Sequence, residues 1–219
     1  MPPDLISPNV KFLLDSLIPP RPPELVAMEA YAAEHDFPII GPASGQLCYL
    51  VAKMIGARRV FELGSGYGYS TAWFARAVRE NGGGEVFHVV WDEELSRMAR
   101  KHLDALALGD LVRYQVAEAV GALRAADGKF DLIFNDIDKK GYPESLPVIE
   151  DKLRPGGVLI IDNMLWSGRI FDDADTSPNT EGVREFTRLI TTSDRWTASI
   201  IPIRDGVLVG RYAGGGVRS

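Results

Sequence analysis

Apolar positions along the chain follow two periods, and the order in which these periods alternate predicts the fold class. Short, nearly continuous apolar runs of strand length are separated by longer segments in which apolar residues recur every three or four positions. In chain order these segments predict helix 44–55, strand 58–63, helix 70–80, strand 85–90, helix 93–107, strand 111–116, helix 118–125, strand 130–135, helix 142–152 and strand 157–161. Such an alternation is typical of an α/β fold with a doubly wound, mostly parallel sheet.

The two ends of the chain depart from this alternation. Residues 1–37 have helical apolar spacing with a proline-rich break, and we interpret them as a helical N-terminal extension of a single domain spanning 1–219. Residues 170–180 form an irregular segment near the other end. The elements predicted after it are a helix near 181–193 and the strands 196–202 and 206–212. Because only the short turn 204–206 joins these strands, they would form a hairpin that adds an antiparallel C-terminal strand to the sheet.

A glycine-rich turn between the first predicted strand and the helix that follows it indicates a cofactor site. Gly64, Gly66 and Gly68 let the backbone turn tightly and approach a ligand, and the helix points unpaired N–H groups at the turn. A dinucleotide-binding turn needs its third glycine at the position of Tyr69, so an NAD-dependent dehydrogenase is disfavoured. Glu62, just before the turn, suits a positively charged cofactor such as S-adenosylmethionine (SAM).

Polar side chains follow two later strands at the point where each strand ends. Asp136 comes directly after one buried strand, and Asp162 and Asn163 follow the next. If these strands are neighbours, three oxygen donors converge at one edge of the sheet and suit a hard divalent cation such as Mg²⁺. Beside such a site Lys139 could act as a general base. The alternative interpretation is that the Asp and Asn residues only begin turns and that the lysine is solvated.

Composition narrows the function classes. Hydrophobic residues make up 46% and charged residues 25% of the 219 residues, which is ordinary for a globular enzyme. The net charge of −6 disfavours a broad nucleic-acid surface. A single cysteine, Cys48, rules out an intrachain disulfide framework and fits a reducing cytoplasm. Because no long apolar run is visible, we expect a soluble, cytoplasmic protein without a membrane partner.

Three stretches together resemble the cation-dependent class I O-methyltransferases, the group that contains catechol and caffeoyl-CoA O-methyltransferases. They are residues 62–70, 136–139 and 162–168, and the pairs 45–46 and 205–206 extend the resemblance over nearly the whole chain. The resemblance implies a seven-stranded, Rossmann-like methyltransferase sheet, with SAM and a divalent cation (Mg²⁺, or alternatively Mn²⁺ or Ca²⁺) as cofactors. It also implies a hydroxylated, aromatic small-molecule acceptor and a homodimer.

The resemblance further implies roles for single residues. The cofactor site would comprise the backbone near Gly41, closing over SAM, and the residues at the amino-acid end of SAM, which are Glu62, Gly64, Gly66 and Ser70. The metal ligands would be Asp136, which also belongs to the cofactor site, Asp162 and Asn163, with Lys139 as the base. The acceptor would be flanked by Trp166, Arg169 and residues 170–180.

The sequence departs from the family pattern where the ribose of the cofactor usually binds. An acidic residue usually ends the second strand of this fold, but Val90 stands there and cannot accept hydrogen bonds from the ribose. Asp92 would substitute through a shifted backbone, or would only cap the next helix. Trp91 would stack on the adenine, and Glu118 is the counterpart of a second acidic residue near the adenine. These departures lower the expected affinity for the cofactor.

Three functions therefore stay open. The first, which the resemblance favours, is a metal-dependent O-methyltransferase acting on a catechol-like small molecule with vicinal hydroxyl groups. The second is methylation of a hydroxyuridine-type tRNA base, which the acidic net charge disfavours. The third is a binding or interaction protein that keeps the fold and has lost tight cofactor binding. Val90 favours this third function, and the intact metal and base residues oppose it.

Overall fold

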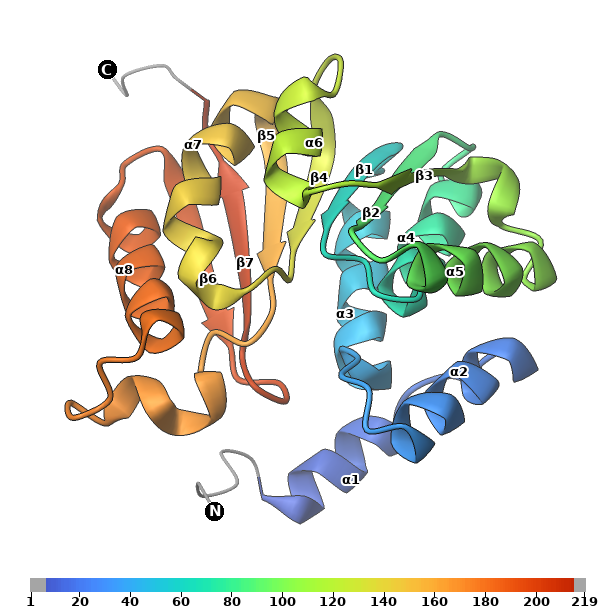
Figure 1. The fold of residues 1–219 in the computed structure, drawn as a ribbon, viewed down its shortest axis with the longest axis horizontal. Helices are drawn as coiled ribbons and strands as arrows, with labels where there is room; N and C mark the ends of the chain where they lie inside the picture. Colours follow the sequence, from blue (N-terminus) through green and yellow to red (C-terminus); the bar gives the residue numbers. More distant parts are fainter. Residues whose placement is uncertain (1–6, 215–219) are drawn as a thin grey trace.

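A seven-stranded sheet forms the centre of the molecule in the computed structural model, which describes residues 7–214 (Figure 1). Its strands are β1 (Arg59–Leu63), β2 (Glu85–Val90), β3 (Val112–Val116), β4 (Phe130–Asn135), β5 (Leu153–Ile161), β6 (Trp196–Ile201) and β7 (Val207–Tyr212). Their spatial order is β3-β2-β1-β4-β5-β7-β6. Neighbours from β3 to β5 pair in parallel, whereas β7 is antiparallel to both β5 and β6. The predicted α/β fold, with its mostly parallel seven-stranded sheet and antiparallel C-terminal strand, is confirmed.

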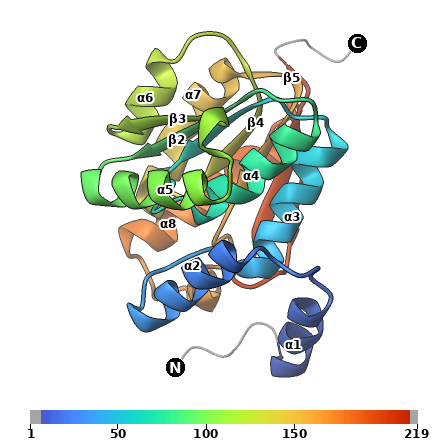
Figure 2. The same ribbon diagram turned by 90° about the vertical axis from the view of Figure 1, so that its right-hand side faces the viewer.

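Helices cover both faces of the sheet, as Figures 1 and 2 show. One layer consists of α3 (Gly41–Met54), α4 (Tyr69–Glu80) and α5 (Glu93–Ala105), and the other of α6 (Ala119–Ala125), α7 (Tyr142–Lys152) and α8 (Pro178–Thr192). A 3₁₀ turn, η1 (Gly109–Leu111), precedes β3. Successive strand residues alternate between the two cores: Val60 joins the core under α3 and α4, and Phe61 joins the core under α7 and α8. Both faces of the sheet are therefore buried, which explains the nearly continuous apolar runs.

Two helices precede α3 and lie below the sheet in the view of Figure 1. They are α1 (Pro8–Ser16) and α2 (Pro23–Glu34). α2 buries Met28, whose carbonyl accepts a hydrogen bond of 2.8 Å from the Tyr67 hydroxyl, whereas α1 buries no residue. The limits of the predicted single domain and of its N-terminal extension stay predictions, since residues 1–6 and 215–219 lie outside the described part. Over residues 7–214, no helix is both long enough and apolar enough to cross a membrane.

Three of the predicted elements begin three or more residues earlier in the structure than expected. α3 begins at Gly41 rather than at position 44, and α8 begins at Pro178 rather than at 181; in both cases a proline in the first turn starts the helix. β5 begins at Leu153 rather than at 157, because Leu153 already pairs with Phe130 before a shift in register. A 3₁₀ turn, η3 (Trp166–Phe171), overlaps the start of the segment 170–180 that was predicted to be irregular, and Ser167 and Gly168 interrupt this turn in the left-handed conformation.

Acid should weaken this fold through His88, a fully buried histidine on β2. Its Nδ1 lies 3.0 Å from the Thr71 hydroxyl, and its ring lies 5.5 Å from that of Tyr114. Burial, with a smaller effect from the charge of Arg100, lowers the pKa of His88 to about 3. The unfolded chain, whose histidine pKa is about 6.5, therefore binds this proton at a higher pH than the folded protein. Between about pH 6.5 and pH 3, the free energy of unfolding falls by up to about 1.4 kcal/mol for each unit of decrease in pH.

Urea unfolding of the wild type and of His88→Gln at pH 7 and pH 5 measures this effect. Between these two pH values the wild type should lose about 2 kcal/mol more of its free energy of unfolding than the variant loses. Comparing losses within each protein removes any change in stability that the substitution itself causes. If the free energy of unfolding fell equally in the two proteins, His88 would not be the cause of the acid sensitivity.

Candidate active site

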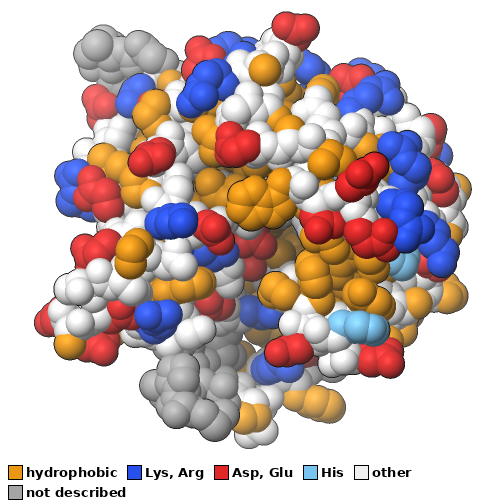
Figure 3. Space-filling model, viewed as in Figure 1, with side chains coloured by type: hydrophobic (Ala, Val, Ile, Leu, Met, Phe, Trp, Pro, Cys, Tyr) orange, Lys and Arg blue, Asp and Glu red, His pale blue; other side chains and the backbone are white. Residues whose placement is uncertain are grey.

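A cavity of about 560 Å³ lies beyond the carboxyl ends of β1, β2 and β4, at the place where open α/β sheets bind ligands. It is walled by the glycine turn after β1, by the loops after β2, β3 and β4, and by residues 37–40 between α2 and α3. Figure 3 shows this side of the molecule hollowed near its centre, with apolar and acidic side chains around the hollow. Its size suits a ligand as large as a nucleoside.

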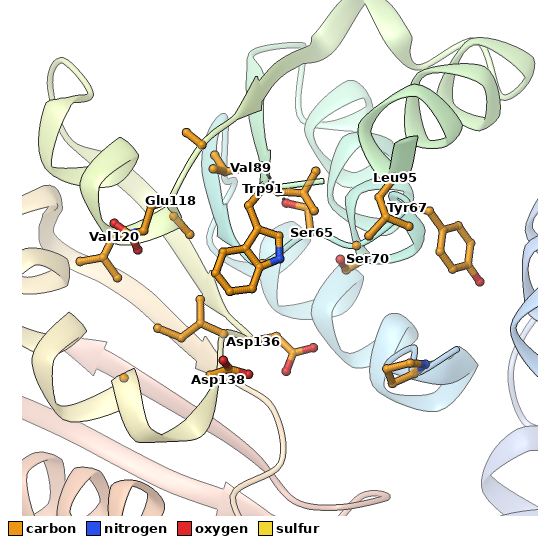
Figure 4. Close-up of a pocket in the computed structure, with 18 of the residues that line it drawn as sticks. Ser65, Tyr67, Ser70, Val89, Trp91, Leu95, Glu118, Val120, Asp136 and Asp138 are labelled. Atoms are coloured by element: carbon orange, nitrogen blue, oxygen red, sulfur yellow. Dashed lines mark hydrogen bonds between the residues drawn. The ribbon is translucent and has the colours of Figure 1, made fainter. Parts of the chain in front are cut away.

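Gly64 allows the glycine turn to approach the end of β4 closely. Its φ of +85° lies in the left-handed region, and a Cβ at this position would be 2.7 Å from the backbone oxygen of Asp136. Ser65 ties the turn to β2, since its N–H donates to the Val89 carbonyl at 3.0 Å and its hydroxyl accepts from the Val89 N–H at 2.9 Å. Both Gly64 and Gly66 line the cavity, as does Ser70 in the first turn of α4 (Figure 4).

Glu62 is a fully buried carboxylate at the end of β1. Neither of its oxygens has a hydrogen-bond partner among the described residues. Burial raises the pKa of Glu62 to about 7, although the hydroxyls of Ser70 and Thr71 act in the opposite direction. Because these hydroxyls do not offset the cost of burying the carboxylate, this position suits a ligand that brings a positive charge. Glu62 itself is not among the residues that line the cavity.

Of the residues that were predicted to surround the adenosine of the cofactor, some line the cavity and one does not. Val90 and Trp91 both line the cavity, and the Trp91 indole, 75% exposed, stands over it in Figure 4. Glu118 also lines the cavity, while its carboxylate caps α6 by accepting the N–H groups of Val120 at 2.8 Å and Gly121 at 2.6 Å.

Asp92 is not brought to the cavity. Its Oδ1 accepts the Leu95 N–H at 2.9 Å and caps α5, which is the alternative that the sequence left open for this residue. Gly41, the first residue of α3, is likewise outside the cavity wall, although the four residues before it form part of that wall.

β4 and β5 are neighbours, and this pairing brings the predicted metal ligands to one edge. Asn135 pairs with Ile161, so that Asp136 and Asp162 follow at the same level of the sheet. Asp162 is 4% exposed and its Oδ1 has no partner among the described residues. Burial and then the charge of Asp136 raise the pKa of Asp162 to about 7. The strand pairing and this effect of Asp136 both place the two carboxylates at the same edge of the sheet.

The residues at this edge fit a hard divalent cation. Asn163 has a left-handed φ of +59°, and its Nδ2 donates to Asp205 Oδ2 at 3.1 Å, which leaves the amide oxygen as the available acceptor. The donors are thus two carboxylates and an amide oxygen, as Mg²⁺ prefers, and one carboxylate oxygen is buried without a partner. Over residues 7–214 no cluster of three or more His, Cys, Asp or Glu side chains is placed to hold a metal ion. The candidate set would need water or acceptor oxygens to complete the coordination.

Lys139 belongs to the same edge. It begins a 3₁₀ turn, η2 (Lys139–Gly141), and its Nζ lies 2.8 Å from Asp136 Oδ1. The side chain is only 11% exposed, and its ammonium lies 5.7 Å from the centre of the Trp166 ring. The structure therefore brings Asp136, Lys139 and Trp166 together, while their roles as metal ligand, base and acceptor contact stay predictions.

Arg169 is held within its own loop. Its Nε donates to Asp175 at 2.6 Å and its Nη2 to the Ser177 hydroxyl at 3.2 Å, while its guanidinium lies 5.8 Å from the Trp166 ring centre. The loop is held in turn by Arg184 on α8, which donates to the carbonyl oxygens of residues 169, 170, 172 and 175. The sequence offered no signal for Arg184, because an arginine at a helical position usually faces solvent.

Asp205 is a second residue whose role the sequence analysis did not identify. Besides accepting from Asn163, its carboxylate accepts the Ser167 N–H at 2.5 Å, and its carbonyl accepts the Leu165 N–H at 2.8 Å. Asp205 therefore holds the loop after β5 against the β6–β7 hairpin. An Asp before a Gly in a short hairpin turn is a signal for side-chain capping that could have pointed to it.

Comparisons with known proteins agree with this geometry. A model of the O-methyltransferase family matches residues 24–212. A catechol O-methyltransferase of Niastella koreensis is 31% identical over 183 residues, which cover 81% of this chain and 82% of that protein. The structure of the O-methyltransferase TomG of Streptomyces achromogenes in complex with SAM has a TM-score of 0.84 and 27% identity, covering 94% of this chain and 96% of that one. The structure of an O-methyltransferase of Bacillus cereus in complex with S-adenosylhomocysteine (SAH) also has a TM-score of 0.84 and 27% identity. This match covers 93% of this chain and 97% of that one. The chain belongs to the O-methyltransferase family, as its resemblance to the class I enzymes predicted.

Proposed function

We propose that the protein is a SAM-dependent, divalent-metal-dependent O-methyltransferase whose acceptor is a catechol-like small molecule with two adjacent hydroxyl groups. The observation that carries this proposal is the edge formed by β4 and β5, where a buried carboxylate oxygen of Asp162 without a partner lies close to the Asp136–Lys139 pair. This edge adjoins the cavity, since Asp136 lines it. A methyl donor in the cavity and an acceptor at the edge would then be adjacent.

Groups in and beside the cavity suit each part of SAM. Glu62, two residues before Gly64 of the cavity wall, would take the ammonium group, because its buried carboxylate has no hydrogen-bond partner among the described residues. Ser70, which lines the cavity, would bind at the carboxylate end. The exposed indole of Trp91 offers a face for the adenine, as stacking of an aromatic side chain on a base is favourable. Val90 leaves the ribose without its usual carboxylate partner. We therefore expect the affinity for SAM to depend strongly on the contacts at its amino-acid end and at its adenine.

Methyl transfer from SAM to a hydroxyl group of the acceptor needs one acid–base group from the protein. A bound divalent cation would stabilise the ionised form of an acceptor hydroxyl, and SAM would supply the methyl group. Lys139 would act as the base in its neutral amine form, which requires that it first lose its own proton to solvent when a cation takes over the Asp136 carboxylate; its Nζ, 2.8 Å from Asp136, would then take up the proton of that hydroxyl. Trp166 would bound the acceptor beside Lys139. Holding the acceptor oxygen near the methyl group would provide much of the rate advantage.

The position of the hydroxyl groups on the acceptor tests this proposal. Benzene-1,2-diol should be methylated with a kcat/KM at least about 100-fold higher than the 1,3 and 1,4 isomers, because only adjacent hydroxyls can share one cation and place one oxygen correctly. Transfer of labelled methyl groups from SAM to the three isomers in Mg²⁺ measures this ratio. Equal rates would contradict the vicinal-hydroxyl assignment. No transfer to any isomer would favour the alternative that this protein keeps the fold but has lost tight cofactor binding.

The homodimer implied by the family resemblance stays a prediction. α1 exposes Phe12 at 77% and Leu13 at 54%, so an apolar surface is present at the N-terminal end of the described chain. This surface supports the prediction, because large apolar side chains gathered on one helix often mark an interface.

A further inference from the structure

Residues 37–40 cover the glycine turn of the cofactor cavity. All four residues line the cavity. A Cβ on Gly66 would lie 3.5 Å from the Phe37 ring, which shows that Phe37 rests directly on the turn. The same ring packs edge-on against Tyr67 with centres 4.9 Å apart. This segment, which lies between α2 and α3, therefore forms the part of the cavity wall that rests on the glycine turn.

Arg204, on the hairpin between β6 and β7, is attached to this segment. Its Nη1 donates to the Ile39 carbonyl at 2.6 Å. A Cβ on Gly41 would lie 3.3 Å from its Nε and 3.4 Å from its Cζ, so the guanidinium lies against the backbone of residues 39–41. Gly41, with a φ of +68°, leaves the space that this approach requires.

Arg204 is also next to a residue that contacts the loop after β5. The following residue, Asp205, accepts the hydrogen bond from Asn163 at 3.1 Å. The backbone of Arg204 is left-handed, with a φ of +50°, a conformation that costs energy for a residue other than glycine or asparagine. A strained backbone that presents a charged side chain to a distant segment indicates that the side chain has a role.

We propose that Arg204 is a positioning residue that holds residues 37–40 closed over the cofactor cavity. This inference rests on the proposed function in so far as SAM is the ligand of that cavity. A guanidinium that donates to a carbonyl is a charge-assisted contact, which is stronger than a neutral hydrogen bond, and its partly exposed setting lets it open for ligand exchange. The contact therefore slows the departure of the bound ligand more than it affects the chemistry of methyl transfer.

The binding of S-adenosylhomocysteine, the demethylated form of SAM, to three variants tests this role. In Arg204→Met, calorimetry should show a Kd about tenfold higher than that of the wild type, and stopped-flow tryptophan fluorescence should assign most of the change to faster dissociation. Arg204→Lys, which keeps the charge and a donor, should recover a large part of the affinity. Arg211→Met removes an arginine from β7 of the same hairpin, close to Gly156, and should bind like the wild type.

Hydrogen exchange gives a readout that does not require a ligand. In ligand-free Arg204→Met the backbone amides of residues 37 and 39–41 should exchange faster than in the wild type, while those of the sheet should not. Unchanged affinity and dissociation rate in Arg204→Met, with a wild type that binds, would overturn this inference alone. Faster exchange throughout the molecule would overturn it too, because it would show general destabilisation. A wild type that does not bind would overturn the cofactor assignment of the proposed function, and this inference with it.

Discussion

Asp162→Asn should lose both its affinity for Mg²⁺ and its methyl transfer. The buried Asp162 Oδ1, which has no hydrogen-bond partner within residues 7–214, is the strongest argument for a cation at this edge. The substitution removes the charge of this carboxylate without changing the shape of the side chain. Loss of a residue that merely supports a metal ligand costs about 10- to 100-fold in metal affinity, so loss of a ligand should cost at least about 100-fold. Calorimetric titration with Mg²⁺ and transfer to a vicinal diol measure the two effects.

The stability of Asp162→Asn provides the control for misfolding. In the absence of metal its thermal midpoint should not fall below that of the wild type, since burying a carboxylate without a partner destabilises the folded protein. Asp151→Asn, which changes a carboxylate at the exposed end of α7, should leave Mg²⁺ binding and transfer unchanged. An Asp162→Asn protein that binds Mg²⁺ as tightly as the wild type would contradict the metal assignment.

Lys139→Met should lower kcat by about 10²- to 10⁴-fold, the usual contribution of a general base. Lys139→Arg should lose about as much, because arginine can keep the ion pair with Asp136 but stays protonated and cannot accept the proton. The Kd for S-adenosylhomocysteine should change little in either variant, since Lys139 does not line the cofactor cavity. Single-turnover transfer from SAM to a vicinal diol separates the loss in kcat from any change in binding.

Lys140→Met is the matched control, since it removes the neighbouring lysine, which is exposed and forms part of the cavity wall. It should retain a kcat close to that of the wild type. If Lys139→Arg transferred methyl groups as fast as the wild type, the positive charge rather than proton transfer would be the contribution of Lys139. If Lys140→Met lost as much as Lys139→Met, the role of base would not belong to Lys139.

Local patterns were sufficient to predict the sheet and the place of the site. Continuous apolar runs marked the strands because both faces of the sheet are buried. Asp136 and Asp162 could be placed together because the residues that follow neighbouring parallel strands meet at one edge. The glycine turn was predictable for a similar reason, since a backbone that approaches Asp136 as closely as Gly64 does has no room for a side chain.

Contacts between distant segments were beyond the reach of these patterns. Arg204 lies beside Ile39 only because the β6–β7 hairpin and the start of α3 meet at the same edge of the folded sheet. Arg169 was expected beside the acceptor, but its partner Asp175 depends on how its loop folds against α8. For Asp92 the sequence left two roles open, and the position of the Leu95 N–H distinguishes them only in the folded chain.

Methyl transfer from labelled SAM to benzene-1,2-diol, measured in Mg²⁺, with a chelator, and again after Mg²⁺ is restored, tests the central claim most directly. We predict transfer in Mg²⁺, a fall of at least about 100-fold with the chelator, and recovery when the metal returns, because the ionised acceptor hydroxyl needs a cation at the Asp136–Asp162 edge. Transfer that continues at the same rate in the chelator would contradict metal dependence, and with it the role that we assign to this edge.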